Sequence, residues 1–142
     1  MAATSYFNER TSTVLVVEGE ALIRDFLHIV LNRMGHVVLE ARDGAEGLTV
    51  SRKFNGHIDL VIADVQMPKI DGLTMVRLLQ AKRPGMKVLR ISGDSPESLP
   101  NDSRKNFLHK PFPPAAIEQK VQEMLARDEA LSIPTKANAA SG

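Results

Sequence analysis

Five polar side chains of types that handle phosphate follow short apolar runs of the sequence. They are Glu18, Glu20, Asp64, Ser92 and Lys110. A carboxylate oxygen can attack phosphorus and form an aspartyl phosphate. The charge on the phosphoryl oxygens is then balanced by a divalent ion and a fixed cation, a role that suits the compact ammonium group of lysine. If the fold gathers these residues, they predict a phosphoryl-accepting site.

Two of these residues have plainer explanations when each is taken alone. An aspartate at the end of a strand, such as Asp64, is most often a structural acid that caps a loop, and otherwise a metal ligand or a nucleophile. Lys110 alone is most simply explained as a solvated surface charge. The functional hypothesis therefore depends on whether the elements of the fold bring the residues to one place.

Apolar runs and amphipathic segments alternate along the chain. The runs indicate buried parallel strands at 13–17, 36–40, 58–64, 87–92 and 107–110. Apolar residues at helical spacing lie between them, and Asp43 and Pro113 with Pro114 are helix-start signals. Five β-α units in series predict an α/β fold, in which helices cover both faces of a parallel sheet. The carboxyl ends of such strands share one edge, where ligands bind.

One segment departs from this regular pattern. Residues 93–106 contain Pro96 and Pro100 and few apolar side chains. Proline removes a helical hydrogen bond and clashes with the preceding turn. We therefore expect the fourth helix to be short or irregular, and the nearby surface to be reshaped.

Length and composition limit the possible classes of protein. The 142 residues predict one domain at 12–127 with flexible tails at 1–11 and 128–142. A net charge of +1 gives no reason to expect nucleic acid or a membrane surface as a partner. The chain has no cysteine, which excludes disulfides, thiolate zinc sites and cysteine nucleophiles and fits a cytoplasmic location. We find no apolar run of signal-peptide or membrane length.

Four segments of the sequence resemble the receiver domains of bacterial two-component response regulators. They are VLVVEGE (14–20), LVIADVQMPKIDGL (60–73), VLRISG (88–93) and FLHKPF (107–112). The second is highly specific, because an apolar strand ends in Asp and is followed by Met-Pro and Asp-Gly. The resemblance implies a flavodoxin-like fold with strand order 2-1-3-4-5. It implies a single-domain response regulator in a phosphorelay.

The resemblance assigns a role to each matching position. It makes Asp64 the phosphoacceptor, Ser92 and Lys110 the groups that contact the phosphoryl group, and Phe107 the aromatic switch. It implies that Lys110–Pro111 is a cis peptide bond. It also implies that the donor is a phosphohistidine on a sensor histidine kinase or phosphotransfer protein, and that a downstream signalling protein reads the result.

The same resemblance implies a Mg²⁺ site, which this sequence alters. The ligands would be Glu18, Asp64 and the main-chain carbonyl of Gln66, with Glu20 as a further candidate. The family usually has two adjacent aspartates after the first strand, and the second of them touches the metal. Here that second place is Gly19, which has no side chain. Because Mg²⁺ needs only one or two carboxylates, we expect weaker binding rather than none.

Two other functions fit parts of the sequence. A pseudo-receiver would use the same fold as a phosphorylation-independent protein-binding module, a hypothesis that Gly19 motivates. A phosphatase acting through an aspartyl phosphate usually has a second acid two residues after the nucleophile, where this chain has Gln66. We therefore expect no enzyme acting on an external substrate, and only self-phosphorylation and self-dephosphorylation.

Overall fold

A single parallel sheet forms the centre of the molecule. The computed structural model describes residues 11–67, 69–95, 97 and 106–126. Their five strands are β1 (Thr13–Val17), β2 (Val37–Ala41), β3 (Leu60–Asp64), β4 (Lys87–Ser92) and β5 (Phe107–His109). All neighbours are parallel, in the order β2-β1-β3-β4-β5. The predicted flavodoxin-like strand order is confirmed.

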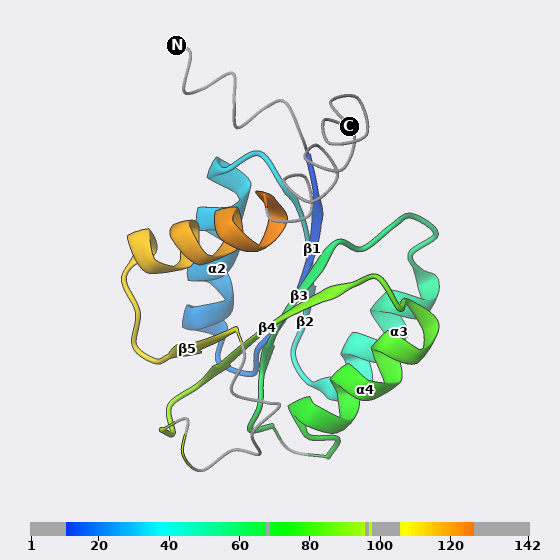
Figure 1. Ribbon diagram of the computed structural model, residues 1–142. Coiled ribbons are helices and arrows are strands. Elements are labelled where there is room, and N and C mark those ends of the chain that lie inside the picture. Colours follow the sequence, from blue (N-terminus) through cyan, green and yellow to red (C-terminus); the bar gives the residue numbers. More distant parts are fainter. Residues whose placement is uncertain (1–10, 68, 96, 98–105, 127–142) are drawn as a thin grey trace, which may run out of the picture.

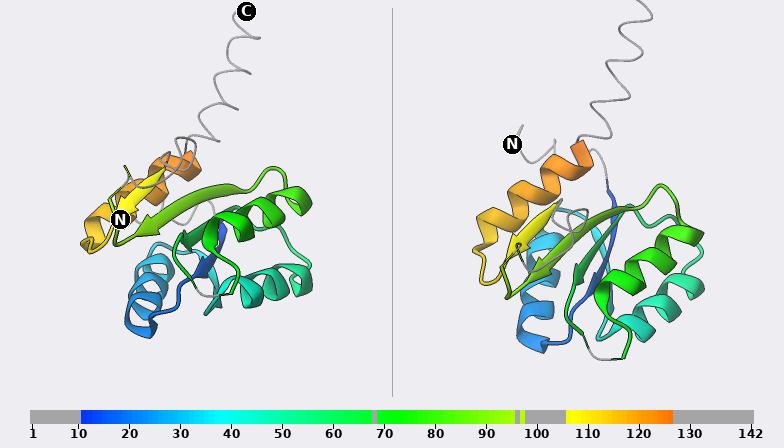
Figure 2. Two further views of the ribbon diagram at one scale, coloured as in Figure 1. Left: turned by 90° about the horizontal axis from the view of Figure 1, so that it is seen from below. Right: turned by 60° about the horizontal axis from the view of Figure 1, so that its bottom comes forward.

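Helices cover both faces of this sheet. The described part of the chain contains four, namely α2 (Ala21–Arg33), α3 (Gly44–Lys53), α4 (Gly72–Lys82) and a helix over residues 114–126. Figure 1 shows α2 and the helix at 114–126 on one face, and α3 and α4 on the other; Figure 2 shows the same layers from two further directions. None of these helices is long and apolar enough to cross a bilayer.

Alternation along β1 explains why both faces are covered. Val14 and Val16 belong to the apolar cluster under α2 and residues 114–126, whereas Leu15 and Val17 belong to the cluster under α3 and α4. All four side chains are fully buried. Successive residues of a strand point to opposite faces, so a continuous apolar run requires a cover on each side.

The helix starts differ in how they are capped. The Asp43 carboxylate accepts a hydrogen bond from the Glu46 N–H at the start of α3, and Asp71 accepts one from Thr74 at the start of α4, both at 2.8 Å. These caps satisfy N–H groups that have no partner within the helix. Helix α2 follows Glu20, whose side chain makes no capping hydrogen bond.

Three expectations about boundaries have different outcomes. The third strand begins at Leu60 rather than at 58, because its pairing with β1 and β4 starts at Leu60 and Ile58 is buried without strand pairing. The Asp59 carboxylate accepts a hydrogen bond from the Thr13 N–H at 2.8 Å. The predicted tails lie almost wholly outside the described residues. Most of the segment expected to hold a short fourth helix, 98–105, also lies outside them.

Candidate functional site

The strand register places the predicted polar residues at one edge of the sheet. Val17 pairs with Ala63, so Glu18 and Asp64 follow at the same level. Asp64 pairs with Ile91, and Ser92 in turn pairs with His109. Lys110 comes directly after His109. Residues 46 positions apart, such as Asp64 and Lys110, therefore meet through the topology of the sheet.

Lys110 is the centre of a cluster of carboxylates. Its Nζ atom lies 2.9 Å from Asp64 Oδ2, 2.9 Å from Glu18 Oε1 and 3.9 Å from Glu20 Oε1. The side chains of Lys110, Asp64 and Glu18 are 14%, 11% and 1% exposed, whereas that of Glu20 is 71% exposed. One ammonium group thus compensates two largely buried carboxylates, with Glu20 at the solvent side.

Main-chain N–H groups fix the other oxygen of each buried acid. The Gln66 N–H donates to Asp64 Oδ1 at 2.9 Å, and the Glu20 N–H donates to Glu18 Oε2 at 2.9 Å. Glu18 Oε1 is different, because its contact with Lys110 is not aligned as a hydrogen bond. It is a buried carboxylate oxygen whose contact within the described residues is with the Lys110 ammonium group, 2.9 Å away. Such an oxygen retains the capacity to bind a further cation or donor.

The pKa of Lys110 reflects two opposing influences. Burial acts to lower the pKa of Lys110, because it disfavours the charged form. The hydrogen bond to Asp64, the contact with Glu18 and the charges of both acids outweigh that effect. The pKa of Lys110 is therefore raised, and the side chain stays an ammonium group at neutral pH.

Ser92 lies at the same edge but turns its hydroxyl elsewhere. Its side chain is fully buried, and Ser92 Oγ accepts a hydrogen bond from the Asp94 N–H at 3.0 Å. The Asp94 carboxylate in turn accepts a short hydrogen bond from the Gln66 side chain. Ser92 is thus linked to Asp64 through Asp94 and Gln66, and the Ser92 carbonyl accepts the Lys110 N–H at 2.8 Å.

The other two predicted positions lie beside this cluster. Phe107 begins β5, opposite Arg90, and its side chain is half-buried. Lys110–Pro111 is a cis peptide bond, the form that the resemblance implies. Two residues near the cluster are not predicted from the sequence, namely Asp94 and Arg24, which contacts the main chain of Glu18. The position of Asp94, two residues after Ser92, is the sequence signal that could have identified it.

Glycine is required where α4 approaches the end of β3. A Cβ atom at Gly72 would lie 2.1 Å from the Asp64 carbonyl oxygen and 2.7 Å from Val65 Cα. These are backbone atoms, which cannot move aside without shifting the strand that carries Asp64. The Asp-Gly pair of the motif therefore has two physical roles, with Asp71 capping α4 and Gly72 permitting its close approach.

The residues present fit a Mg²⁺ ion with a reduced ligand set. Within the described residues no three acidic or histidine side chains are grouped as a metal site. Glu18 and Asp64 still supply two carboxylates at one point, and Glu18 Oε1 makes no aligned hydrogen bond beside its contact with the Lys110 ammonium group. A Cβ atom at Gly19 would meet only Arg42 O, at 3.5 Å, so the backbone leaves room for the missing acid. Mg²⁺ commonly retains several waters beside one or two carboxylates.

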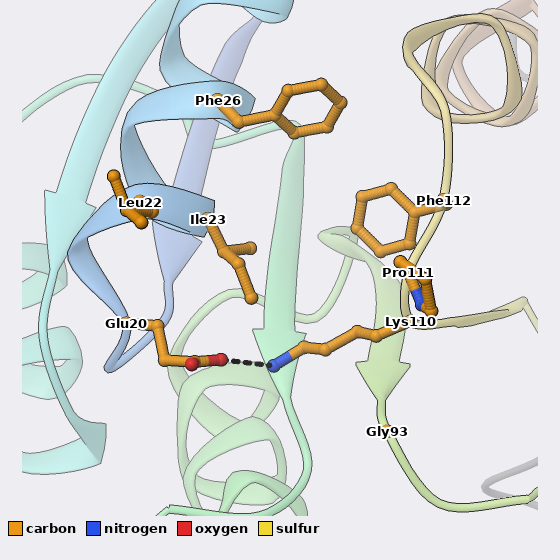
Figure 3. A pocket seen from close by; sticks show the side chains of 8 residues that line it. All are labelled: Glu20, Leu22, Ile23, Phe26, Gly93, Lys110, Pro111 and Phe112. Carbon is orange, nitrogen blue, oxygen red and sulfur yellow. Dashed lines mark ion pairs between the residues drawn. The ribbon is translucent and has the colours of Figure 1, made fainter.

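An apolar pocket of about 480 Å³ opens beside the lysine. Its lining residues are Glu20, Leu22, Ile23, Phe26, Gly93, Lys110, Pro111 and Phe112. Figure 3 shows apolar side chains of α2 facing the segment after β5, with the Glu20–Lys110 ion pair at the polar end. The Phe26 and Phe112 rings are 6.0 Å apart between centroids, and Leu22 is 85% exposed. The carboxylate cluster thus has an apolar surface at its border.

Comparison with known proteins decides the family. The sequence profile of the response regulator receiver domain matches residues 14–122. The chain belongs to this family. The receiver domain is 35% identical over 123 residues to the sensor kinase CckA of Brucella abortus (strain 2308), covering 84% of this chain and 13% of that protein. It is 31% identical over 126 residues to the probable transcriptional regulator ycf27 of Cyanophora paradoxa, covering 86% of this chain and 52% of that protein.

Solved structures show the same fold. The receiver domain of the hybrid histidine kinase CckA is 33% identical, with a TM-score of 0.69, and covers 80% of this chain and 99% of that chain. A CheX-CheY-BeF3-Mg²⁺ complex from Borrelia burgdorferi contains a chain that is 27% identical, with a TM-score of 0.73, covering 80% of this chain and 89% of that chain. This receiver domain therefore matches proteins named as kinases and as regulators alike, and it spans 13% and about half of the length of the two curated relatives named above.

Proposed function

We propose that Asp64 accepts a phosphoryl group from a phosphohistidine on a sensor histidine kinase or phosphotransfer protein. An Asp64 oxygen attacks phosphorus, the bond between phosphorus and the imidazole nitrogen breaks, and neutral histidine is regenerated on the donor after protonation. The observation that carries the proposal is the position of Lys110 Nζ, 2.9 Å from Asp64 Oδ2. A fixed ammonium group at that place counters the negative charge of the phosphoryl oxygens.

The remaining residues have supporting roles in this proposal. Ser92 would turn its hydroxyl from Asp94 to a phosphoryl oxygen, and Phe107 would reorient as the β4 side of the site moves. The altered surface would then bind a downstream signalling protein, in the cytoplasm. The chemistry of the domain is limited to its own phosphorylation and hydrolysis, without turnover of an external substrate.

A divalent ion would complete the site, bound more weakly than the family pattern implies. Glu18, Asp64 and the Gln66 carbonyl would hold Mg²⁺, with Glu20 as a further ligand. The ion would supply positive charge against the phosphoryl oxygens. The reduced affinity is attributed to Gly19, which contributes no carboxylate.

Mass spectrometry after treatment with a small phosphodonor and Mg²⁺ tests the phosphoacceptor. We expect one phosphoryl adduct on the wild-type protein and none on Asp64→Asn, because the amide is a poor nucleophile. An adduct of equal yield on Asp64→Asn, or none on the wild type, would reject the proposal. The second outcome would favour the pseudo-receiver, in which the Lys110 ion pairs with Glu18 and Asp64 are purely structural.

The apolar border of the site is where the donor protein would dock. Leu22, 85% exposed, lines the apolar pocket together with the half-buried Ile23, Phe26 and Phe112, and a contiguous apolar surface of this kind marks a protein-binding site. Leu22→Glu should slow phosphotransfer from a histidine phosphotransfer protein by about tenfold, since an apolar contact is replaced by a charge. The adduct rate with a small phosphodonor should not change, and stability should stay within about 0.5 kcal/mol.

The matched control for this surface is Leu78→Glu. Leu78 is 47% exposed on α4, on the opposite face of the sheet. Its replacement should leave both rates unchanged. Equal slowing by the two substitutions would reject docking at the border of the pocket, because a general effect of surface charge would then be sufficient.

A further inference from the structure

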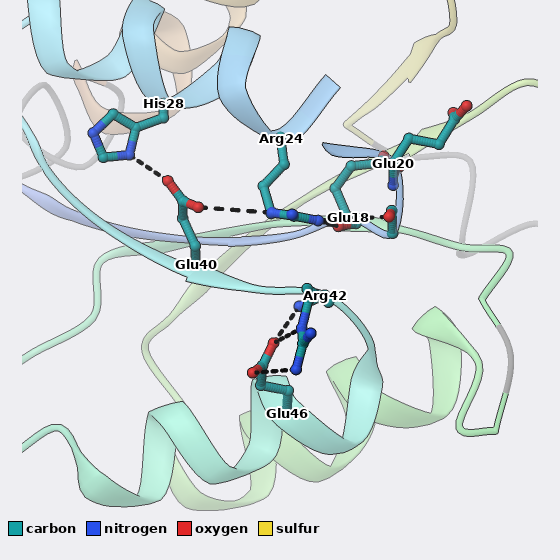
Figure 4. Close-up of polar contacts among 8 residues, drawn as sticks. Glu18, Glu20, Arg24, His28, Glu40, Arg42 and Glu46 are labelled. Atoms are coloured by element: carbon teal, nitrogen blue, oxygen red, sulfur yellow. Dashed lines mark hydrogen bonds and ion pairs between the residues drawn. The ribbon is translucent and has the colours of Figure 1, made fainter. Parts of the chain in front are cut away.

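Arg24 tethers the loop that carries the first buried acid. Its guanidinium donates from Nη1 to the Glu18 carbonyl oxygen at 2.8 Å, and the same atom lies 3.5 Å from the Gly19 carbonyl oxygen. Figure 4 shows the side chain reaching from α2 back to this loop. The Arg24 side chain is only 15% exposed, so the contact is made largely out of water. Hydrogen bonds from charged donors in such surroundings are among the stronger ones.

The place of Arg24 in its helix argues for this role. It lies in the first turn of α2, where the helix dipole disfavours a positive charge. That turn has no acidic residue and no side-chain cap, in contrast to the aspartate caps of α3 and α4. The guanidinium is therefore not stabilising the helix terminus through its charge. Its favourable contacts are with the loop and with β2.

Glu40 contacts Arg24 from the other side, and His28 contacts Glu40. Glu40 lies on β2 beside Val16, and its Oε1 atom is 3.7 Å from Arg24 Nε. Its second oxygen makes a short contact with His28 Nδ1, also on α2 (Figure 4). The guanidinium is thus fixed between the end of β1 and the carboxylate of the neighbouring strand. Contacts on both sides of the guanidinium restrict rotation of the Arg24 side chain.

The loop formed by residues 18–20 needs the contact with Arg24 because it contains Gly19. Glycine has the widest conformational freedom, and a Cβ atom there would have no neighbour closer than 3.5 Å. The Glu18 carboxylate must nevertheless point at Lys110, with its second oxygen on the Glu20 N–H. Fixing the Glu18 main chain limits the directions that its side chain can take.

We propose that Arg24 is a positioning residue that aims the Glu18 carboxylate into the phosphoryl site, with Glu40 as its support. The expected effect on phosphorylation rests on the proposed phosphoacceptor function. The effect of Arg24 on the direction of the Glu18 carboxylate does not depend on it. Arg24 touches neither the phosphoryl group nor the ion in this scheme. It acts through the main chain of Glu18.

Amide hydrogen exchange tests the geometry without phosphorylation. The Glu20 N–H is bonded to Glu18 Oε2, so Arg24→Gln should speed its exchange by about tenfold, and Glu40→Gln by less. Arg24→Lys should restore part of the protection, since an ammonium group can still reach the Glu18 carbonyl. The control Arg42→Gln removes only an exposed pair with Glu46 and should leave the Glu20 amide unchanged.

Phosphorylation of the same variants tests the consequence. At subsaturating Mg²⁺, Arg24→Gln should form the adduct about tenfold more slowly and require more Mg²⁺ for half-maximal rate, with Arg42→Gln like wild type. Unchanged Glu20 exchange in Arg24→Gln, or faster exchange with an unchanged Mg²⁺ dependence, would overturn the positioning role. Absence of any adduct on the wild-type protein would instead reject the proposed function. The exchange rate of the Glu20 amide alone would then decide whether Arg24 positions Glu18.

Discussion

Replacing Lys110 by alanine is expected to prevent phosphorylation of Asp64 and to lower the free energy of unfolding by about 3 kcal/mol. The substitution leaves the carboxylates of Glu18 and Asp64, 1% and 11% exposed, without the ammonium group that lies 2.9 Å from each. Removing one partner of a buried ion pair is costly because the remaining charge keeps its desolvation penalty. The adduct is lost because the Lys110 ammonium group, which lies next to the Asp64 carboxylate, no longer counters the phosphoryl charge.

The pH dependence of this loss has a definite sign. The pKa of Lys110 is raised above its ordinary value of 10.5, because its contacts with Asp64 and Glu18 outweigh burial. A raised pKa contributes stability that is fully present below the pKa of the unfolded chain and disappears as pH rises through the folded value. The stability difference between wild type and Lys110→Ala should thus be constant between about pH 6 and pH 9, and should shrink above 10.5.

Urea unfolding at several pH values measures this difference, with Lys120→Ala as control. Lys120 forms a partly exposed i,i+3 pair with Glu123 at 3.8 Å, so its loss should cost no more than about 1 kcal/mol. Equal stability of wild type and Lys110→Ala at neutral pH would contradict the central role of the cluster. An undiminished adduct on Asp64 in the variant would contradict it from the chemical side.

Introducing aspartate at Gly19 should raise the affinity for Mg²⁺ by about tenfold or more. The backbone can take the side chain, because the Cβ atom would lie 3.5 Å from its nearest neighbour, Arg42 O. A third carboxylate adds a ligand beside Glu18 and Asp64. In the absence of metal the same charge should destabilise the protein, because like charges crowd a site that has Lys110 as its cation.

Calorimetric Mg²⁺ titration compares Gly19→Asp with Gly19→Asn, which has nearly the same shape without the charge. Only Gly19→Asp should bind Mg²⁺ more tightly than the wild-type protein does. Comparable affinity of the wild type and Gly19→Asp would show that Gly19 does not weaken the site. A gain shared by both variants would assign the effect to loop rigidity, since both replace a glycine.

The sequence predicted the fold because its strands are continuous apolar runs. Runs such as 13–17 must be buried on both faces, and that requirement fixes a parallel sheet with helices on each side. The edge where Glu18, Asp64 and Lys110 meet follows from strand direction alone. The early start assigned to the third strand had a simple cause, because Ile58 is as deeply buried as a strand residue but lies outside the ladder.

Finer features of the site could not be predicted from residue order. The orientation of Ser92 Oγ toward Asp94 is a choice among side-chain rotamers set by the following loop. The sharing of Lys110 between two acids depends on distances of a few ångströms. Arg24 was missed because an arginine in a helix appears ordinary until its partner carbonyl is known, although a cation in an uncapped first turn was a usable signal.

The most direct test is an NMR titration with Mg²⁺ followed by the phosphoryl mimic beryllofluoride. We expect saturable shifts at the amides of Asp64, Ser92 and Lys110, and no such shifts in Asp64→Asn. That result would show that the carboxylate, hydroxyl and ammonium groups gathered at the sheet edge respond together to a tetrahedral group on Asp64. No shift at these amides at saturating beryllofluoride and Mg²⁺, or the same shifts without the Asp64 carboxylate, would contradict the proposed site.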